Sequence, residues 1–358
     1  MAGIFMNTGV ICEFNPFHAG HKYLFEKIRE SGNDKRIICV MSGNFVQRGD
    51  FAVYNKFTRA KAALQNGADL VIELPAEQAL LSAEGFAKSA VMLAESLGVV
   101  DELAFGAENN NIAELKKMAE MLKDKNTQEK IKTEMKAGIS YPAARKNAIQ
   151  SDLLDSPNNI LACEYIKETK LPCFAVKRIG KGHDSDDVAY SASQIRKTLS
   201  ADETANIKNC ESAFLYRLRS MTKEDFSKIA DVNEGLENRL YDAAGRASSF
   251  EEFLFLVKSK RYTLSRIRRI AFRAYLGMEG IGYEVPVIRV LGFNQCGREL
   301  LSEIKKRTDK PIITKLSDCD ETNLAYFQKQ CRYTDLYSLA YKNPLPRGEE
   351  QRSQIVII

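Results

Sequence analysis

Two of the chain's three histidines, His18 and His21, stand three positions apart in a His-Ala-Gly-His segment. They follow a short apolar run, residues 8–13, and a turn that contains a proline. Residues at i and i+3 share a helix face, so both imidazoles can point to one spot at the start of a helix. Gly20 leaves the backbone uncovered there, and free amides at a helix N-terminus favour phosphate. Many His-x-x-His pairs are unrelated surface residues. Strand, turn, glycine and helix together instead predict a nucleotide-phosphate site, in which histidine donors stabilise developing charge.

Three later segments could complete such a site. Residues 41–50 follow a second apolar run and carry Gly, Asn, Gln and Arg. Residues 156–161 begin a helix whose amides could bind an adenine edge or a phosphate. Residues 191–196 begin another helix, where two serine hydroxyls and an arginine suit terminal phosphates. Each segment alone is also consistent with plain helix capping, but their order after the histidine turn favours an ATP site.

The elements around these residues indicate the fold class. Apolar runs typical of buried strands alternate with helical patterns through the first half. The expected strands are residues 8–13, 36–41, 69–74, 102–105 and 173–179, and the clearest helices are residues 19–31 and 83–97. This alternation predicts an α/β fold with a Rossmann-like, doubly wound parallel sheet. Ligands of such sheets bind beyond the carboxyl ends of the strands, near the switch point.

The alternation of strand and helix patterns ends near residue 201. Residues 211–276 carry helical patterns with almost no strand signal, and strands are expected at 284–291 and 311–316, with helices at 298–307 and 323–341. We therefore expect two domains: an ATP-binding nucleotidyltransferase-like domain over residues 1–200, and a mainly helical region over 201–358. The second contains a small α/β appendix at about 283–318.

Composition narrows the class of protein. The chain has 358 residues and a net charge of +5, which permits a nucleic-acid partner without requiring one. Its eight cysteines show no CxxC spacing, so a zinc site is not expected and reduced thiols are. No apolar run approaches the roughly 20 residues of a membrane span, and the first residues lack a signal-peptide layout. We expect a cytoplasmic protein.

The motifs together resemble the tRNA(Met) cytidine acetate ligase family, a branch of the HxGH nucleotidyltransferases. The histidine turn alone is typical of the whole superfamily, whereas all the motifs taken together resemble those of this branch. The resemblance rests on residues 13–21, 41–49, 69–75, 105–109, 157–161, 177–180, 191–196, 260–263 and 292–294. The sequence departs from the family pattern at Ala162, where the family has glycine.

The resemblance implies an ATP-dependent ligase. Acetate and ATP would give acetyl-adenylate and pyrophosphate, and the acetyl group would pass to the N4 amine of the wobble cytidine of elongator tRNA(Met), forming N4-acetylcytidine. His18 and His21 would be catalytic. The ATP site would comprise Ile11, Cys12, Glu13, Phe14, Asn15, Pro16, Phe17, His18, Ala19, Gly20, His21, Lys22, Tyr23, Leu24, Gly106, one or both of Asn158 and Asn159, Arg178, Ser191, Ser193 and Arg196. Mg²⁺ is expected on the ATP phosphates, since no protein ligand set is evident.

A basic segment in the second half is the candidate tRNA-binding surface. It has seven basic residues and no acidic one, namely Lys258, Lys260, Arg261, Arg266, Arg268, Arg269 and Arg273. Arg266, Arg269 and Arg273 would share one helix face, which predicts contacts to tRNA phosphates. A solvated helix face is the alternative. Lys56 and Arg59 form a second basic pair that could contact phosphate or simply lie at the surface.

Two other functions use the same motifs. A nucleotidyltransferase could join AMP to a small phosphorylated substrate, but it would not need the basic helix or the second half. A non-catalytic tRNA-binding protein could keep the nucleotide fold, but it would not need both histidines. No pattern marks an acetate pocket; Phe14, Phe45 and Val46 are the nearest apolar candidates.

Overall fold

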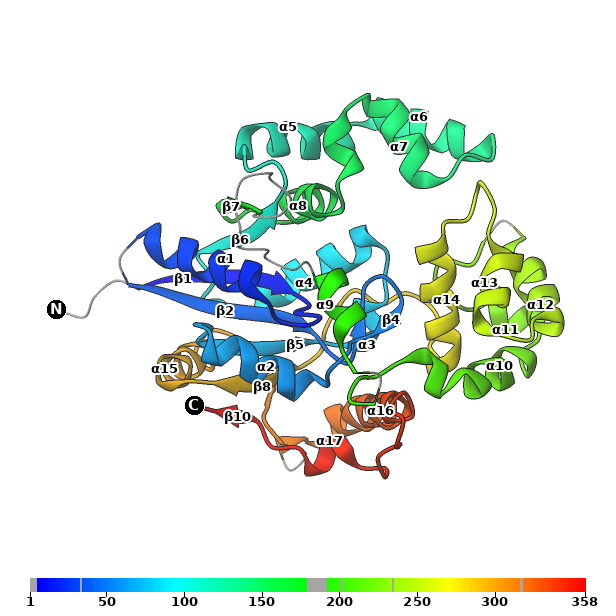
Figure 1. Cartoon of the computed structure of the whole chain (residues 1–358). Helices are drawn as coiled ribbons and strands as arrows, with labels where there is room; N and C mark the ends of the chain where they lie inside the picture. Colours follow the sequence, from blue (N-terminus) through cyan, green and yellow to red (C-terminus); the bar gives the residue numbers. More distant parts are fainter. Residues whose placement is uncertain (1–4, 33, 179–191, 201, 234, 316–317) are drawn as a thin grey trace.

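A computed structural model of the chain describes residues 5–32, 34–178, 192–200, 202–233, 235–315 and 318–358 (Figure 1). Its centre is a sheet in the strand order β10-β8-β5-β2-β1-β6-β7. Five strands from the first half run parallel: β1 (Met6–Cys12), β2 (Lys35–Ser42), β5 (Leu70–Leu74), β6 (Glu102–Ala107) and β7 (Cys173–Lys177). The predicted doubly wound α/β fold is confirmed.

Alternating side chains of the strands build two hydrophobic cores, one on each face of the sheet. In β2, Ile37 and Cys39 pack beneath α1 (Ala19–Glu30) and α2 (Lys56–Gln65). Ile38 and Val40 face α4 (Ala83–Ser96), α5 (Ile112–Lys123) and α8 (Pro157–Glu168). A central parallel strand is buried on both faces, which is why β2 reads as a continuous apolar run.

The predicted α/β appendix joins this sheet. Strand β8 (Ile288–Phe293) pairs antiparallel with β5, and both β9 (Ile312–Ile313) and β10 (Val356–Ile357) pair with β8. Helix α15 (Gln295–Ile304) follows β8. This edge departs from the parallel prediction because β8 enters from the helical region and not through a β-α-β crossover, so its direction is not constrained.

The helical region lies beside the sheet, at the right of Figure 1. It comprises α10 (Glu211–Arg219), α11 (Lys223–Ser227), α12 (Leu236–Arg246), α13 (Phe250–Val257) and α14 (Leu264–Leu276). Its core also takes in α16 (Glu321–Ser338) and two phenylalanines from a hairpin of the first half, formed by β3 (Phe45–Val46) and β4 (Asp50–Phe51). The hairpin therefore anchors the two halves of the chain to each other.

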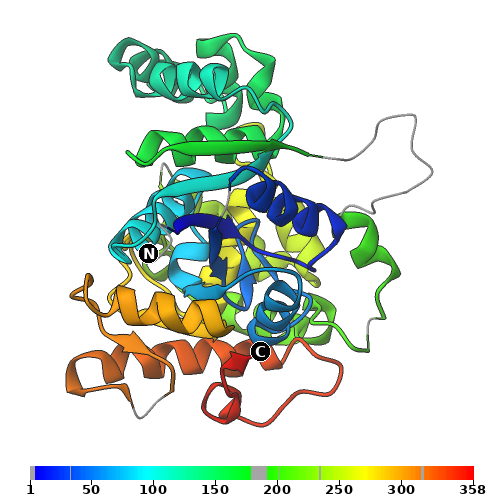
Figure 2. The ribbon, with the colours of Figure 1, turned by 90° about the vertical axis from the view of Figure 1, so that its left-hand side faces the viewer.

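Several short elements had no clear sequence signal. Helices α6 (Lys125–Lys136) and α7 (Tyr141–Ile149) extend α5 into an arm at one end of the molecule, opposite the C-terminal helices (Figure 2). The others are α3 (Ala76–Ala79), α17 (Glu349–Arg352), η1 (Asp152–Asp155) and η2 (Ile207–Asn209). Helix α9 (Ala192–Thr198), by contrast, was predicted to begin within residues 191–196. Among the described residues, no helix is both long and apolar enough to span a bilayer.

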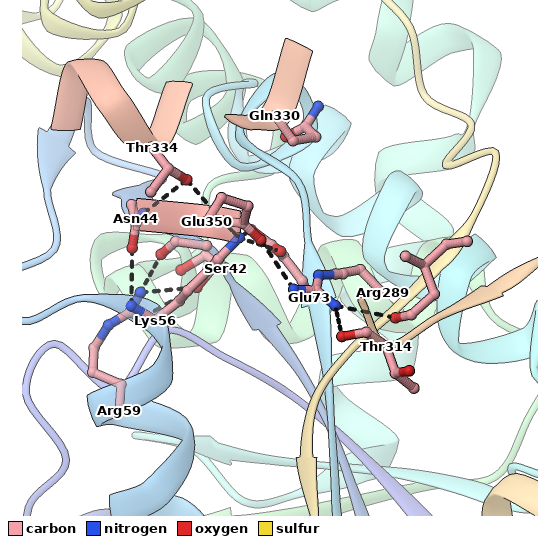
Figure 3. A network of polar contacts seen from close by, with 12 residues as sticks. Ser42, Asn44, Lys56, Arg59, Glu73, Arg289, Thr314, Gln330, Thr334 and Glu350 are labelled. Atoms are coloured by element: carbon pink, nitrogen blue, oxygen red, sulfur yellow. Dashed lines mark hydrogen bonds and ion pairs between the residues drawn. The ribbon is translucent and has the colours of Figure 1, made fainter. Parts of the chain in front are cut away.

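A buried ionic network fixes the C-terminal segment to the sheet (Figure 3). The Lys56 ammonium lies 2.7 Å from a Glu73 oxygen and 2.7 Å from a Glu350 oxygen. The Arg289 guanidinium reaches the other oxygen of Glu350 at 3.1 Å. All four side chains are buried, so their charges balance each other in the interior. Lys56 is thus a structural cation and not a surface or phosphate-binding one.

Candidate active site

The sheet has its switch point between β1 and β6. The chain leaves β1 toward α1 on one face and leaves β6 toward α5 on the other. Diverging connections open a crevice at the carboxyl ends of these two strands, which is where ligands bind in this class of sheet. The histidine turn follows β1 and Gly106 lies near the end of β6, so two sequence-predicted parts of the site meet here.

The two histidines begin α1. His18 is the N-cap residue, and its Nδ1 accepts a hydrogen bond from the Gly20 amide at 3.0 Å. The Nδ1 of His21 accepts from the His18 amide at 3.2 Å. Their rings stack with centroids 3.8 Å apart. Since both Nδ1 atoms accept, each neutral ring carries its proton on Nε2, and both Nε2–H groups remain as donors.

Burial keeps these imidazoles neutral. It lowers the pKa of His18 to about 4, with the positive charges of Arg178 and Arg196 as further causes. Burial, His18 and Arg178 together hold the pKa of His21 well below its usual value. Phe14 packs edge-on against the His21 ring at 4.8 Å. Neutral donors surrounded by guanidinium groups form a site suited to an anion.

Titration of His18 tests this description. Its NMR midpoint in the free protein is expected near pH 4, well below an ordinary histidine at about 6.5. Between those values the unfolded chain binds a proton that the folded chain does not, so folding stability falls as the solution is acidified through this window. Adding ATP should raise the midpoint, because phosphate favours the imidazolium. A free-protein midpoint near 6.5 would contradict a buried, neutral donor.

A side chain at position 20 would collide with the His18 ring in its observed position. A Cβ at this position would lie 2.9 Å from Cε1 of His18, closer than side-chain atoms approach. The sequence suggested that this glycine leaves room for a nucleotide. The glycine also lets the His18 ring close over the helix start. That it leaves room for a nucleotide stays a prediction.

Arg59 holds the loops behind the site. It is 1% exposed, and its guanidinium donates to the main-chain oxygens of Glu13, Ser42 and Gly43. These carbonyls end β1 and β2. Arg59 therefore organises the crevice from beneath, and the alternatives of a phosphate ligand or a surface charge are both wrong for it.

Four predicted site residues lie near the end of β6. Arg178 lies across Gly106, where a Cβ would meet the arginine Cγ at 3.3 Å. The side-chain Oδ1 of Asn159 accepts a hydrogen bond from the main-chain amide of Asn109 at 2.9 Å, and the side-chain amide of Asn158 donates to the Glu108 carboxylate. Asn159 is buried and Asn158 is partly exposed. Both asparagines thus fix the loop that follows β6, next to Gly106.

Helix α9 brings Arg196 to the histidine turn. The guanidinium donates to the Asn15 carbonyl at 2.6 Å and to the Ser193 hydroxyl at 3.0 Å. Burial is the main cause that lowers the pKa of Arg196, and Asp50 opposes it. Ser193 therefore orients Arg196. The other predicted serine, Ser191, lies outside the described residues.

Some predicted site residues point into the core. The side chains of Phe14 and Leu24 are buried with the core beneath α1, and Ala162 is 1% exposed within the core beneath α8. Phe45, a candidate for the acetate pocket, packs on Phe272 and Tyr337 in the helical region. These side chains support the site without facing it.

The predicted basic face of α14 is largely internal. Arg269 is 7% and Arg273 is 2% exposed. Arg273 donates to the carbonyls of Glu77 and Gly280, and Arg266 donates to the Asp231 carbonyl. The expectation of a three-arginine phosphate face is wrong, because Arg266 and Arg273 donate to main-chain oxygens and Arg269 pairs with the Asp231 carboxylate at 3.7 Å.

Lys258 and Lys260 remain exposed in the turn between α13 and α14. Arg261, in the same turn, is partly exposed, and Arg268 is bonded to the β3–β4 hairpin. The two lysines are therefore the members of the predicted set that are open to a large partner.

Arg48 is the arginine of residues 41–50, a segment that the sequence predicted to complete the site without assigning a role to Arg48 itself. It is exposed in the turn of the hairpin next to Gln47, whose amide donates to the Glu13 carboxylate at 2.7 Å. A signal was present: Phe45 and Phe51 flank a polar turn with Gly49, which is a hairpin pattern.

Comparison with known proteins agrees with this geometry. The family model described as HIGH Nucleotidyl Transferase matches residues 6–212 and 200–352. A tRNA(Met) cytidine acetate ligase of Acetivibrio thermocellus is 34% identical over 411 residues, covering 98% of this chain and 99% of that protein. One from Thermoanaerobacter sp. (strain X514) is 39% identical over 386 residues, covering 94% and 95%.

A solved structure matches over the same length. The crystal structure of Thermotoga maritima TmcAL bound with alpha-thio ATP superposes with a TM-score of 0.87 at 30% sequence identity. The match covers 99% of this chain and 100% of that one. Since the similarity includes both halves, it extends to the helical region as well as the sheet.

Proposed function

Since the chain belongs to the HIGH nucleotidyl transferases and, among them, to the tRNA(Met) cytidine acetate ligase family, we propose that it is an ATP-dependent ligase that activates acetate as acetyl-adenylate. It then transfers the acetyl group to the N4 amine of the wobble cytidine of elongator tRNA(Met). We infer that this takes place in the cytoplasm, where ATP and tRNA are found.

The pair of neutral histidines at the start of α1 carries this proposal. Their Nε2–H groups stand beside Arg178 and Arg196 at the switch point of the sheet. ATP would lie over β1 and β6, with its phosphates at the N-terminus of α1. As acetate attacks the α-phosphorus, negative charge grows on the departing pyrophosphate, and the histidines would stabilise that charge.

A divalent cation would accompany the phosphates. The described residues contain no group of three or more His, Cys, Asp or Glu side chains placed to hold a metal. We therefore propose that Mg²⁺ binds through phosphate oxygens, where it would offset their charge. The chain's own groups would orient the nucleotide and donate hydrogen bonds.

Acetate-dependent exchange of pyrophosphate into ATP tests the proposed function. Exchange requires reversible adenylate formation and no tRNA, so it isolates the first half-reaction. We expect exchange with acetate and none without it. Exchange that needs a phosphorylated small molecule would identify a nucleotidyltransferase, and ATP binding without any exchange would identify a non-catalytic protein.

The exposed lysines of the α13–α14 turn are the proposed tRNA contacts. Replacing Lys258 and Lys260 with glutamine should weaken tRNA binding and leave pyrophosphate exchange unchanged. Each lost phosphate contact should reduce the salt slope of log affinity by roughly 0.7–0.9. Glutamine at Lys305 and Lys306, exposed after α15 on the opposite side of the molecule (Figure 1), is the matched control. Equal tRNA affinity for both double variants at every salt concentration would rule out this surface.

A further inference from the structure

The β3–β4 hairpin is built into both halves of the protein. Phe45 and Phe51 are buried in the core of the helical region, where the Phe51 ring lies 4.9 Å from that of Phe272. In Figure 1, β4 lies next to α14. The apolar ends of the hairpin are therefore fixed in the helical core, and its polar turn at residues 47–49 lies between Glu13 and α14.

The turn is held from two opposite directions. On the nucleotide side, the Gln47 amide donates to Glu13 at 2.7 Å, and the Gln47 side chain donates to the Leu81 carbonyl at 3.2 Å. On the helical side, Arg268 donates to the Gly49 carbonyl at 3.0 Å and pairs with Asp50 at 2.7 Å.

Gly49 makes the contact with α14 possible. Its φ is +73°, and a Cβ there would lie 2.5 Å from the main-chain nitrogen of Arg269. Only glycine tolerates both the left-handed backbone and this close approach. The turn is consequently locked against the helix one residue after Arg48.

The Arg48 side chain has no structural partner within the described part of the chain. It is exposed and forms no hydrogen bond or ion pair with any described residue. Its charge acts on Glu13 and on Arg196, the two groups that flank the histidine turn. The carboxylates of Glu13 and Asp50 partly offset the repulsion between Arg48 and Arg196. An anion bound beside both guanidinium groups would stabilise them further.

We propose that Arg48 binds the β- and γ-phosphates of ATP, and that Arg268 is a positioning residue that holds the hairpin turn so that Arg48 reaches them. This assignment deepens the ATP site of the proposed function and rests on it only for the identity of the nucleotide. Arg48 would act on the phosphates together with Arg178 and Arg196, whose charges already act on His18.

Nucleotide affinity distinguishes a phosphate ligand from a structural residue. In the full-length Arg48→Ala variant we expect the Kd for ATP to rise roughly tenfold or more, because a charge-assisted hydrogen bond to phosphate is lost. The Kd for AMP should not change, because AMP lacks the phosphates concerned. Calorimetry with ATP, ADP and AMP measures both. Arg246→Ala, which removes an exposed arginine of α12, is the control and should alter neither affinity.

A double-mutant cycle tests the role of Arg268. Arg268→Ala should weaken ATP binding in the wild-type background and have little further effect when Arg48 is already alanine. Arg268→Lys, which keeps the charge that pairs with Asp50, should recover part of the affinity. Additive losses would show that Arg268 does not act through Arg48, and a lowered melting temperature with unchanged ATP affinity would make it purely structural.

Two results would overturn the proposal for Arg48. One is an Arg48→Ala variant that binds ATP as tightly as wild type, and the other is an equal loss of ATP and AMP affinity. Neither depends on acetate. A wild-type protein that binds ATP but shows no acetate-dependent exchange would refute the ligase function and leave the Arg48 assignment intact.

Discussion

Replacing either His18 or His21 with alanine is expected to slow acetyl-adenylate formation by roughly 10²–10³ while changing ATP affinity far less. Both Nε2–H groups are free to donate because both Nδ1 atoms are occupied by backbone amides. Donors aimed at charge that develops during the reaction act chiefly in the transition state. Acetate-dependent pyrophosphate exchange gives the rate, and calorimetry gives the affinity.

The His18 cap requires its own control. Alanine removes both the Nε2–H donor and the cap of α1, whereas asparagine is a good N-cap that cannot extend a donor as far. His18→Asn should therefore keep the melting temperature and still lose the rate. If asparagine restores exchange, His18 acts as a helix cap. If rate and ATP affinity fall in equal proportion, the histidines only bind the ground state.

Replacing Lys56 with methionine is expected to cost about 3–5 kcal/mol of folding stability. The substitution leaves Glu73 and Glu350 close to each other in the interior, with Arg289 as the remaining ion-pair partner of Glu350 (Figure 3). Removing one partner of a buried ion pair leaves an uncompensated charge, which is far more costly than losing a surface pair. Chemical denaturation of the full-length protein measures the change.

Lys342→Met is the matched control. Lys342 pairs with Asp202 at 2.9 Å, but both side chains are more than half exposed. Its loss should therefore change stability by at most about 1 kcal/mol. If the two variants prove equally stable, the buried network contributes no more than a surface pair and does not anchor the C-terminal segment.

The strands and the histidine turn could be predicted because local patterns determine them. Strand β2 is buried on both faces and therefore reads as a continuous apolar run. The three-residue spacing of His18 and His21 after a turn predicts that both stand on one face at the start of a helix. The pairing of β8 with β5 could not be predicted in this way, since residues more than 200 positions apart carry no shared local pattern. Arm helices α6 and α7 were missed because they bury little apolar surface.

The predictions made from runs of basic residues were wrong where those residues are buried. Arg269 and Arg273 share a face with Arg266, as their spacing predicted, but that face is covered. Guanidinium groups can satisfy main-chain carbonyls in the interior, so an acid-free basic run does not by itself indicate an exposed surface. For the same reason, Arg59 lies buried behind the site, where it donates to main-chain oxygens, and neither role that the sequence suggested for it is correct.

Mass spectrometry of elongator tRNA(Met), incubated with the protein, ATP and isotopically labelled acetate, tests the central claim most directly. The account predicts that the wobble cytidine gains one labelled acetyl group, and that the gain requires both ATP and the intact histidine pair. A wobble cytidine that stays unmodified while the protein forms acetyl-adenylate would contradict the proposed transfer to tRNA.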